Sequence, residues 1–396
     1  MSPINIISIL LFIISPILAL PTIIIGIINR KRAAVTLFIL SVGFLGYLYL
    51  PNFSDDKTRY LEIYEDFRNW DYTSFILYNL TNSQDFILQL MFKIAADFGI
   101  KPQWVFYIIL SMILGILFRI LDFVATIFSY DKKEILLTML LMISSLALLD
   151  LFSGTRFMLA SVIALYGVFQ GIVLKKKYIG LLLFIVAGNI HFSLLSFGLV
   201  YILVTFTKID LNYLKIAFVF SFLFLIIPKD FIISVFNSIG LGGALADKAD
   251  AYLKNKDFSS NYLREAGAAG VIIGIIQSIW IYLLYLFLFI KIKTKNNSYK
   301  FLFLATAVLN FFYAVPTIYL RYSIFVKLIL VFLLFINLKE ERLHKFCMLF
   351  VLAFILLQIT NLIIMRYNID ASYTSDTFLL LDILNQEPMR SSQTLR

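Results

Sequence analysis

The sequence predicts an all-α, polytopic membrane protein with about 12 transmembrane helices and further helices at the outer membrane surface. Hydrophobic residues make up 61% of the 396 residues, charged residues make up 15%, and the mean hydropathy is +0.90. Soluble domains are far less apolar. The apolar residues also form long runs, and about 20 such residues in a helix cross the roughly 30 Å hydrocarbon core of a bilayer.

Twelve apolar runs are the candidate spans. The first has no basic residue ahead of it and no cleavage site of small residues, so we expect a retained helix and not a signal peptide. Residues 178–206 as one helix would be about 44 Å long, more than the hydrocarbon core. We therefore predict a hairpin or broken helix that turns near residues 188–191. The spans cover residues 4–28, 33–50, 103–128, 135–152, 156–174, 178–190, 191–206, 214–236, 268–290, 301–319, 322–338 and 346–365.

The basic residues predict how the spans are oriented. Half of the 34 Lys and Arg residues lie in six connections, which the positive-inside rule places in the cytoplasm: residues 30–32, 132–133, 175–177, 208–215, 291–300 and 339–345. The turn 153–155 and both termini then lie outside. We predict one transmembrane domain over residues 1–365, with outer loops 51–102 and 229–267 and an outer tail 366–396.

Composition also excludes several classes of function. The net charge is +10, but the basic residues are scattered through short loops without a nucleic-acid-binding motif, so we expect no nucleic-acid partner. The single cysteine, Cys347, cannot form an internal disulfide, and two histidines are too few for a Cys/His zinc site. We expect no cofactor.

Ionisable residues occur where apolar runs meet the outer face. Arg156 follows Ser153-Gly154-Thr155 at the start of one run, and His191 lies inside another. Such residues are costly in a membrane and are usually functional. The predicted topology places Arg156, His191 and Arg321 on the same side. The alternatives are arginines that anchor helix ends at the membrane surface and a histidine that holds its hairpin together.

The outer loop 51–102 predicts two surface helices. Ser54 or Asp55 can cap the first. Its rings share one face and its charged residues another, namely Tyr60, Tyr64 and Phe67 against Asp55, Arg59, Glu62 and Asp66. Rings and carboxylates suit sugars, and the alternative is an amphipathic helix that lies on the membrane. The second helix, within residues 85–99, is expected to pack through its apolar face.

In their order along the chain these motifs resemble the Wzy type O-antigen polymerases and the related EpsG exopolysaccharide proteins. The resemblance extends over residues 56–322. It rests on Asp56-Lys57-Thr58-Arg59-Tyr60 with Tyr64, Arg156 with Ala160, the basic turn 175–177, Ile190-His191-Phe192-Ser193, and Arg321-Tyr322. The chain departs from typical relatives in a longer stretch between the eighth and ninth spans.

The resemblance implies a bacterial inner-membrane glycosyltransferase of the C type, with helices at the periplasmic surface and an active site that faces the periplasm. Such a polymerase moves a glycan from undecaprenyl diphosphate to a hydroxyl of the next lipid-linked repeat unit, with inversion at the anomeric carbon. The implied partners are the undecaprenyl diphosphate-linked oligosaccharide, membrane lipid and a chain-length regulator.

This reaction assigns roles to candidate residues. Guanidinium groups bind phosphate oxygens bidentately and stay charged, so Arg156, Arg321 and Arg264 are the candidates for the diphosphate, with a local ion pair to Glu265 as the alternative for Arg264. The base that takes the acceptor proton is His191, with Asp56 as the rival. The glycan-binding candidates are Arg59, Tyr60, Tyr64 and Tyr322. Adjacent Asp55 and Asp56 point apart on a helix, so we predict metal-independent activity.

Other functions fit some of the same residues. A transporter or flippase of lipid-linked oligosaccharide also needs cations for the diphosphate, but internal repeats and polar residues along a pathway are expected for it. An O-antigen ligase or an acyltransferase would also use His and Arg near the outer face. A non-catalytic assembly subunit is the remaining alternative.

Overall fold

The computed structural model describes residues 3–52, 55–82, 86–227, 267–291, 296–374 and 378–385, and the regular elements in these ranges are helices. Five apolar stretches there are long enough to cross a membrane: Pro102–Ile127, Thr155–Val173, Gly267–Ile290, Pro316–Ile336 and Leu343–Ile364. Shorter apolar helices accompany them. The prediction of an all-α, multi-pass membrane protein is confirmed, whereas the number of twelve spans stays a prediction.

Contacts divide the chain into two compact units. Unit 1 contains residues 1–80, 85–162 and 358–396. Its helices are α1 (Pro3–Ile14), α2 (Leu20–Ile28), α3 (Arg32–Leu48), α4 (Asp56–Phe67), α5 (Tyr72–Asn82), α6 (Ile87–Asp97), α7 (Pro102–Ile127), α8 (Lys132–Ser145), α9 (Leu148–Phe152), the start of α10 (Thr155–Val168), the end of α20 (Glu341–Ile364), α21 (Arg366–Ser372) and α22 (Leu380–Asn385).

Unit 2 contains residues 81–84 and 163–357. Besides the end of α10 and the larger part of α20, its helices are the π-helix η1 (Phe169–Val173), α11 (Lys177–Ile190), the 3₁₀ turn η2 (Phe192–Leu194), α12 (Leu195–Phe206), α13 (Leu211–Ser221), η3 (Phe222–Leu225), α17 (Gly267–Ile290), α18 (Asn297–Phe311) and α19 (Pro316–Ile336). Within it α18 packs against α12, α13 and α19.

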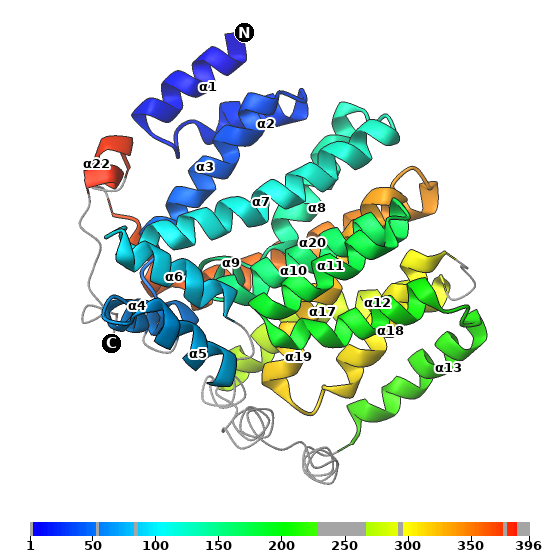
Figure 1. The fold of residues 1–396 in the computed structure, drawn as a ribbon. Coiled ribbons are helices and arrows are strands. Elements are labelled where there is room, and N and C mark those ends of the chain that lie inside the picture. Colours follow the sequence, from blue (N-terminus) through cyan, green and yellow to red (C-terminus); the bar gives the residue numbers. More distant parts are fainter. Residues whose placement is uncertain are drawn as a thin grey trace. The chain divides into compact units, whose positions relative to one another are not determined.

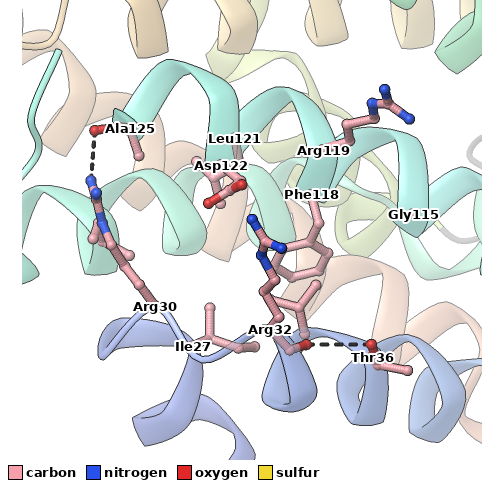
Figure 2. A pocket seen from close by; sticks show the side chains of 12 residues that line it. Ile27, Arg30, Arg32, Thr36, Gly115, Phe118, Arg119, Leu121, Asp122 and Ala125 are labelled. Carbon is pink, nitrogen blue, oxygen red and sulfur yellow. Dashed lines mark hydrogen bonds between the residues drawn. The ribbon is translucent and has the colours of Figure 1, made fainter. Parts of the chain in front are cut away.

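The centre of unit 1 is the pair α3 and α7, which lie side by side (Figure 1). Glycines on α3 permit this close approach, because a Cβ atom at Gly46 would lie 2.6 Å from the Leu110 side chain and one at Gly43 2.9 Å from Tyr107. Where α2 turns into α3, the Arg30 Nη2 donates to the carbonyl oxygens of Ala125 at 2.6 Å and Tyr130 at 3.2 Å (Figure 2). Close packing and this arginine therefore fix α3 against α7.

The single span predicted over residues 4–28 is wrong. The structure has two short helices there, α1 and α2, which contact each other. Pro16 lies between them and Pro21 lies in the first turn of α2. Proline lacks the amide hydrogen and clashes with the preceding turn, so the helix ends before Pro16. Each piece is shorter than a bilayer core, since α1 with 12 residues extends about 18 Å.

The predicted span 135–152 is also interrupted, between Ser145 and Leu148. The interruption exposes carbonyl groups that a continuous helix would use. The amide nitrogen of Gln358 donates to the carbonyl oxygen of Ser144 at 2.9 Å and to that of Leu146. A backbone carbonyl in a membrane needs such a partner, so this side chain on α20 stabilises the break.

In unit 2 the predicted break at residues 188–191 is confirmed. Helix α11 ends at Ile190, His191 is extended with φ −148° and ψ 108°, and the chain continues into η2 and α12, which packs back on α11. The predicted boundary between spans 301–319 and 322–338 is wrong by several residues. The break lies at residues 312–315, before Pro316. Arg321 and Tyr322 therefore belong to the second turn of α19 and not to a loop.

The predicted orientation can be tested with the single cysteine. Cys347 is buried, and Cys347→Ser gives a background without thiols. We expect Asn69→Cys in this background to react with a membrane-impermeant maleimide added to intact spheroplasts, and Lys176→Cys to react only after permeabilisation. Both parent residues are exposed. Reaction of Lys176→Cys in intact spheroplasts would invert the predicted topology.

Candidate functional site

Lys57 is the most deeply buried cation of the outer helix α4. Its side chain is only 1% exposed. The ammonium donates to the carbonyl oxygens of Gly46 at 2.8 Å and Tyr49 at 2.7 Å, at the C-terminal end of α3, and lies 4.8 Å from the centroid of the Phe106 ring. The last carbonyls of a helix lack intrahelical partners and carry partial negative charge. Lys57 therefore caps α3 and joins α4 to it.

Asp55, directly before α4, is the acidic partner in this region. One carboxylate oxygen accepts from the backbone N–H of Asn52 at 2.9 Å and from the Tyr49 hydroxyl at 3.1 Å. Burial raises the pKa of Asp55 above its ordinary value, although these hydrogen bonds, Lys57 and the Ser153 hydroxyl favour the ionised form. Burial also lowers the pKa of Lys57 to about 7. Through Ser153 the carboxylate connects α4 to the turn before α10.

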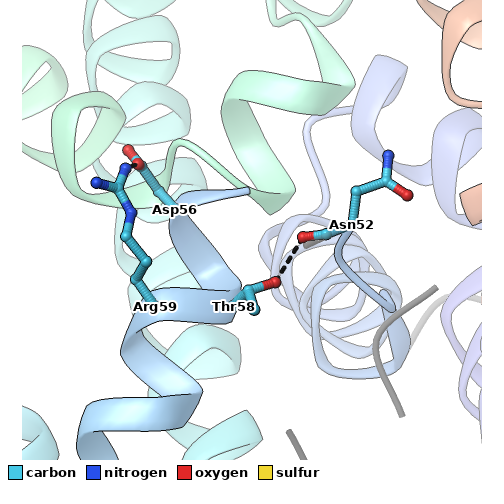
Figure 3. Close-up of polar contacts among 4 residues, drawn as sticks. All are labelled: Asn52, Asp56, Thr58 and Arg59. Carbon is cyan, nitrogen blue, oxygen red and sulfur yellow. Dashed lines mark hydrogen bonds and ion pairs between the residues drawn. The ribbon is translucent and has the colours of Figure 1, made fainter. Parts of the chain in front are cut away.

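Asp56 and Arg59 lie on the other side of α4 and form an ion pair with each other (Figure 3). The Arg59 side chain is 64% exposed and that of Asp56 is 25% exposed. Thr58, between them in sequence, donates from its hydroxyl to the Asn52 carbonyl oxygen at 2.6 Å. The rival base Asp56 is thus engaged by a neighbouring guanidinium, and Arg59 is the accessible cation of this helix.

The rings predicted to face one side of α4 do so, but they pack inside the protein. Tyr60 is 8% exposed and stacks on Phe92 of α6, with ring centroids 5.5 Å apart and an interplanar angle of 5°. Tyr64 is also 8% exposed, and its hydroxyl donates to the Ile100 carbonyl oxygen at 2.5 Å. The packing predicted for the second outer helix is confirmed, since Phe92 is buried in α6. Both tyrosines are buried in the structure. The sugar stacking predicted for them stays a prediction.

Arg156 is the second residue of α10 and is half-buried. Its guanidinium carbon lies 5.9 Å from the centroid of the Tyr60 ring, so unit 1 brings together two residues that the sequence placed 96 positions apart. The first turn of a helix carries partial positive charge and unpaired amide hydrogens, which suit an anion and disfavour a cation. The neighbouring Thr155 hydroxyl is buried and has no hydrogen-bond partner within the described residues. Arg156 and α10 together form an electropositive corner.

Unit 2 contains the second group of predicted residues, His191 and Tyr322. His191 is 6% exposed, and its Nδ1 lies 2.8 Å from the Ser193 hydroxyl oxygen. The Tyr322 hydroxyl donates to the Ser193 carbonyl oxygen at 3.2 Å and accepts from the Ser196 hydroxyl at 3.1 Å. Its ring packs against that of Phe197, with the ring centroids 4.8 Å apart. Tyr322 of α19 therefore holds the turn that carries His191.

Of the remaining predicted residues, Arg321 is among those the structure describes and Arg264 is not. Arg321 is half-buried on α19, next to Tyr322. Arg264 and the outer loop 229–267, except for its last residue, lie outside the described residues. In the described ranges no three His, Cys, Asp or Glu side chains form a group that could hold a metal ion. Metal independence stays a prediction.

Sequence reasoning assigned no role to Lys57, Ser193 or Ser196. The resemblance included Lys57 only as a letter between Asp56 and Thr58, and a lysine in a polar loop is normally solvated. A signal was available, because Lys57 shares a helix face with Tyr60 and Tyr64 at spacings of three and seven residues. A cation on an apolar face predicts a buried partner. The two serines gave no comparable signal.

Lys57→Met is expected to lower the stability of the outer helix. Methionine fills a similar volume but leaves two buried carbonyl oxygens without a donor, at a cost of about 2 kcal/mol. The expected result is a fall of several degrees in the apparent unfolding temperature of the detergent-purified protein. Arg59→Met, which removes an exposed cation from the same helix, is the matched control. Equal unfolding temperatures of Lys57→Met and wild type would contradict the capping role.

The same lysine predicts a pH dependence of definite sign. Its pKa is about 7 in the folded protein and 10.5 as the reference value, so between these values the unfolded chain binds the proton that the folded chain has lost. Stability then rises with pH across this window. We expect the unfolding temperature of wild type, measured relative to that of Lys57→Met, to increase as the pH rises from 7 to 9.

Comparison with known families finds a match over most of the chain. The family model described as the EpsG family matches residues 31–375. This range includes α4 and Arg156 of unit 1 as well as His191 and Tyr322 of unit 2. No curated protein and no solved structure matches the chain.

Proposed function

Because this chain belongs to the EpsG family, we propose that it is a membrane polysaccharide polymerase that lengthens a glycan on undecaprenyl diphosphate. The family match covers the chain from the start of α3 to beyond α21. The observation within the structure that supports this function best is the electropositive corner at α10. Arg156, the helix N-terminus and the Thr155 hydroxyl offer donors to one anion.

The leaving group of the proposed reaction is the lipid diphosphate. The acceptor hydroxyl oxygen attacks the anomeric carbon, the bond from that carbon to the diphosphate oxygen breaks, and the electron pair of the broken bond goes to the diphosphate. Arg156 and Arg321 are proposed to meet this charge. A guanidinium binds two phosphate oxygens at once. Arg264 is a further candidate from the sequence alone.

The attacking hydroxyl must also lose its proton, and His191 is the proposed base. The hydrogen bond between Nδ1 and the Ser193 hydroxyl controls whether it can act. If Nδ1 carries the hydrogen and donates it, Nε2 has a lone pair and can accept a proton. If the serine donates, Nε2 carries the hydrogen and is a donor. Asp56 is the alternative base, and it forms an ion pair with Arg59.

The acceptor glycan is proposed to contact the exposed Arg59 and the region of Tyr322. Tyr322 acts through position, because its hydroxyl is used by Ser193 and Ser196. The same proposal includes an inner-membrane location and an active site that faces the periplasm, which follow from the resemblance and the positive-inside rule. It also includes transfer with inversion and a chain-length regulator as partner, which follow from the resemblance.

The deciding experiment uses the purified full chain and the lipid-linked repeat unit isolated from cells that lack this chain. We expect a ladder of lipid diphosphate-linked polymer on a gel, unchanged by a chelator. Reconstituted protein that moves the lipid-linked glycan across a liposome without lengthening it would support a flippase instead. Transfer of glycan to lipid A core without a lipid diphosphate polymer would support a ligase.

A further inference from the structure

A second cationic site lies in unit 1, at the end of α7 opposite to Pro102. A cavity of about 270 Å³ opens there between α7 and the α2–α3 connection. Three arginines line it from three positions in the chain, Arg30, Arg32 and Arg119, with Asp122 as the one acidic residue in the lining (Figure 2). Its charged side chains thus carry an excess of two positive charges.

The position of Arg119 is unusual for a topology signal. It lies eight residues before the end of α7, about 12 Å along the helix axis, and is exposed. Side chains on a helix lean toward its N-terminus, which is away from the nearer membrane surface and opposes snorkelling. The side chains of Arg32, Arg119 and Asp122 make no hydrogen bond or ion pair with any described residue. A charge at this depth requires a polar partner.

Arg30 is held in place by the fold. Its backbone has a φ of +55°, the left-handed conformation common after a helix C-terminus. Its guanidinium donates to the carbonyl oxygens of Ala125 and Tyr130 at the end of α7. Figure 2 shows Arg30 at one end of the cavity and Arg119 at the other, with Arg32 and Asp122 between them. The cations are therefore spread along a slot.

The rest of the lining is apolar and leaves room for a ligand. Ile27, Phe118 and Leu121 contribute to the walls. A Cβ atom added at Gly115, one turn before Arg119, would meet no atom within 4 Å. The volume is close to the lower limit of about 300 Å³ for small-molecule pockets. Cations beside an apolar wall fit a phosphate attached to a hydrocarbon chain.

We infer that this cavity binds the phosphate of an anionic membrane lipid. The headgroup phosphate contacts Arg32 and Arg119, and the lipid chains lie along α7 outside the cavity. The positive-inside rule assigns the site to the cytoplasmic leaflet, the opposite side from the proposed transfer reaction. The site is independent of the polymerase proposal, because its test measures binding and not glycan transfer.

Native mass spectrometry of the detergent-purified full chain tests this inference. The protein is titrated with phosphatidylglycerol, with phosphatidylcholine, or with inorganic phosphate. We expect tighter binding of phosphatidylglycerol than of phosphatidylcholine. Arg32→Gln and Arg119→Gln should each weaken phosphatidylglycerol binding about fivefold. Asp122→Asn should strengthen it, because a like charge leaves the site.

Two further variants separate this site from general attraction between the protein and anionic lipid. Gly115→Leu keeps every charge and fills the open space, and we expect it to reduce phosphatidylglycerol binding as much as Arg119→Gln. Lys133→Gln removes an exposed positive charge that does not line the cavity and should bind as wild type does. Equal loss in Lys133→Gln, or no loss in Arg32→Gln and Arg119→Gln, would overturn the site. Displacement of the lipid by an equal concentration of inorganic phosphate would overturn its assignment to a lipid.

Discussion

Arg156→Gln is expected to slow glycan polymerisation by at least about 100-fold, the effect of losing one preorganised donor worth about 3 kcal/mol in a transition state. Glutamine is shorter but keeps a hydrogen-bond donor, so the variant removes the charge, the bidentate fork and part of the reach. Arg156 is half-buried, and its guanidinium lies beside the Tyr60 ring. The measurement is the initial rate at which the ladder forms from a fixed amount of lipid-linked repeat unit.

Comparison variants show whether this loss of rate comes from lost binding of the diphosphate by Arg156. Arg156→Lys keeps the charge without the fork and should fall between wild type and glutamine. Arg68→Gln removes an exposed arginine of the outer loop 51–102 and should polymerise at the wild-type rate. The unfolding temperature of each variant is measured in parallel. A folded Arg156→Gln protein that makes full ladders would refute the proposed role.

The second large effect is expected from His191→Ala, which should lower the rate of polymerisation by about 10² to 10⁴, the usual contribution of a positioned base. The ring is buried and its Nδ1 is engaged with Ser193. Removal of the ring therefore also removes a contact within the turn between α11 and α12. A decrease in rate alone would not separate a base from a residue that holds the turn.

The pH profile separates these two roles. With His191 as the base, kcat/KM of the wild type falls at low pH as the ring becomes protonated, and His191→Ala loses this acidic limb. A variant that retains about a tenth of the activity with an unchanged profile would favour a positioning role. Asp56→Asn tests the rival base. An acidic limb that disappears in Asp56→Asn and persists in His191→Ala would move the role to Asp56.

Ser193→Ala tests the hydrogen bond that selects the histidine tautomer. If Ser193 accepts from Nδ1, its loss leaves the ring without an orienting partner, and the rate should fall with the basic Nε2 less populated. Tyr322→Phe, which keeps the ring packing on Phe197 but removes the hydroxyl from Ser193 and Ser196, should produce a smaller decrease through the position of the turn.

Hydropathy predicted the spans that are regular along their whole length. Helices α7 and α17 begin and end within a residue of the predicted runs, because lipid exposure imposes an apolar composition on such helices. The break at His191 was predictable from length alone. The breaks at Ser145 and at residues 312–315 were not, since an apolar run has the same composition whether or not its helix is continuous.

The candidate residues show the same division. Arg156 and His191 could be found because an ionisable residue in an apolar run is conspicuous in the sequence. The residues next to Lys57 in the sequence are charged and polar, and only its helical spacing from Tyr60 and Tyr64 indicated that it could be buried. Its burial depends on the free carbonyls at the end of α3 and on the ring of Phe106.

For this protein the sequence by itself determined the class of fold and identified the ionisable residues in apolar runs, and it predicted the orientation in the membrane. The reason is that the bilayer selects composition strongly at every position of a span. Only the tertiary structure decided which side chains complete one another. It placed Tyr60 beside Arg156, Gln358 at the break after α8, and three arginines around one cavity. The physical reason is that hydrogen bonds and charge pairs depend on distances of a few ångströms between residues that are far apart in the chain.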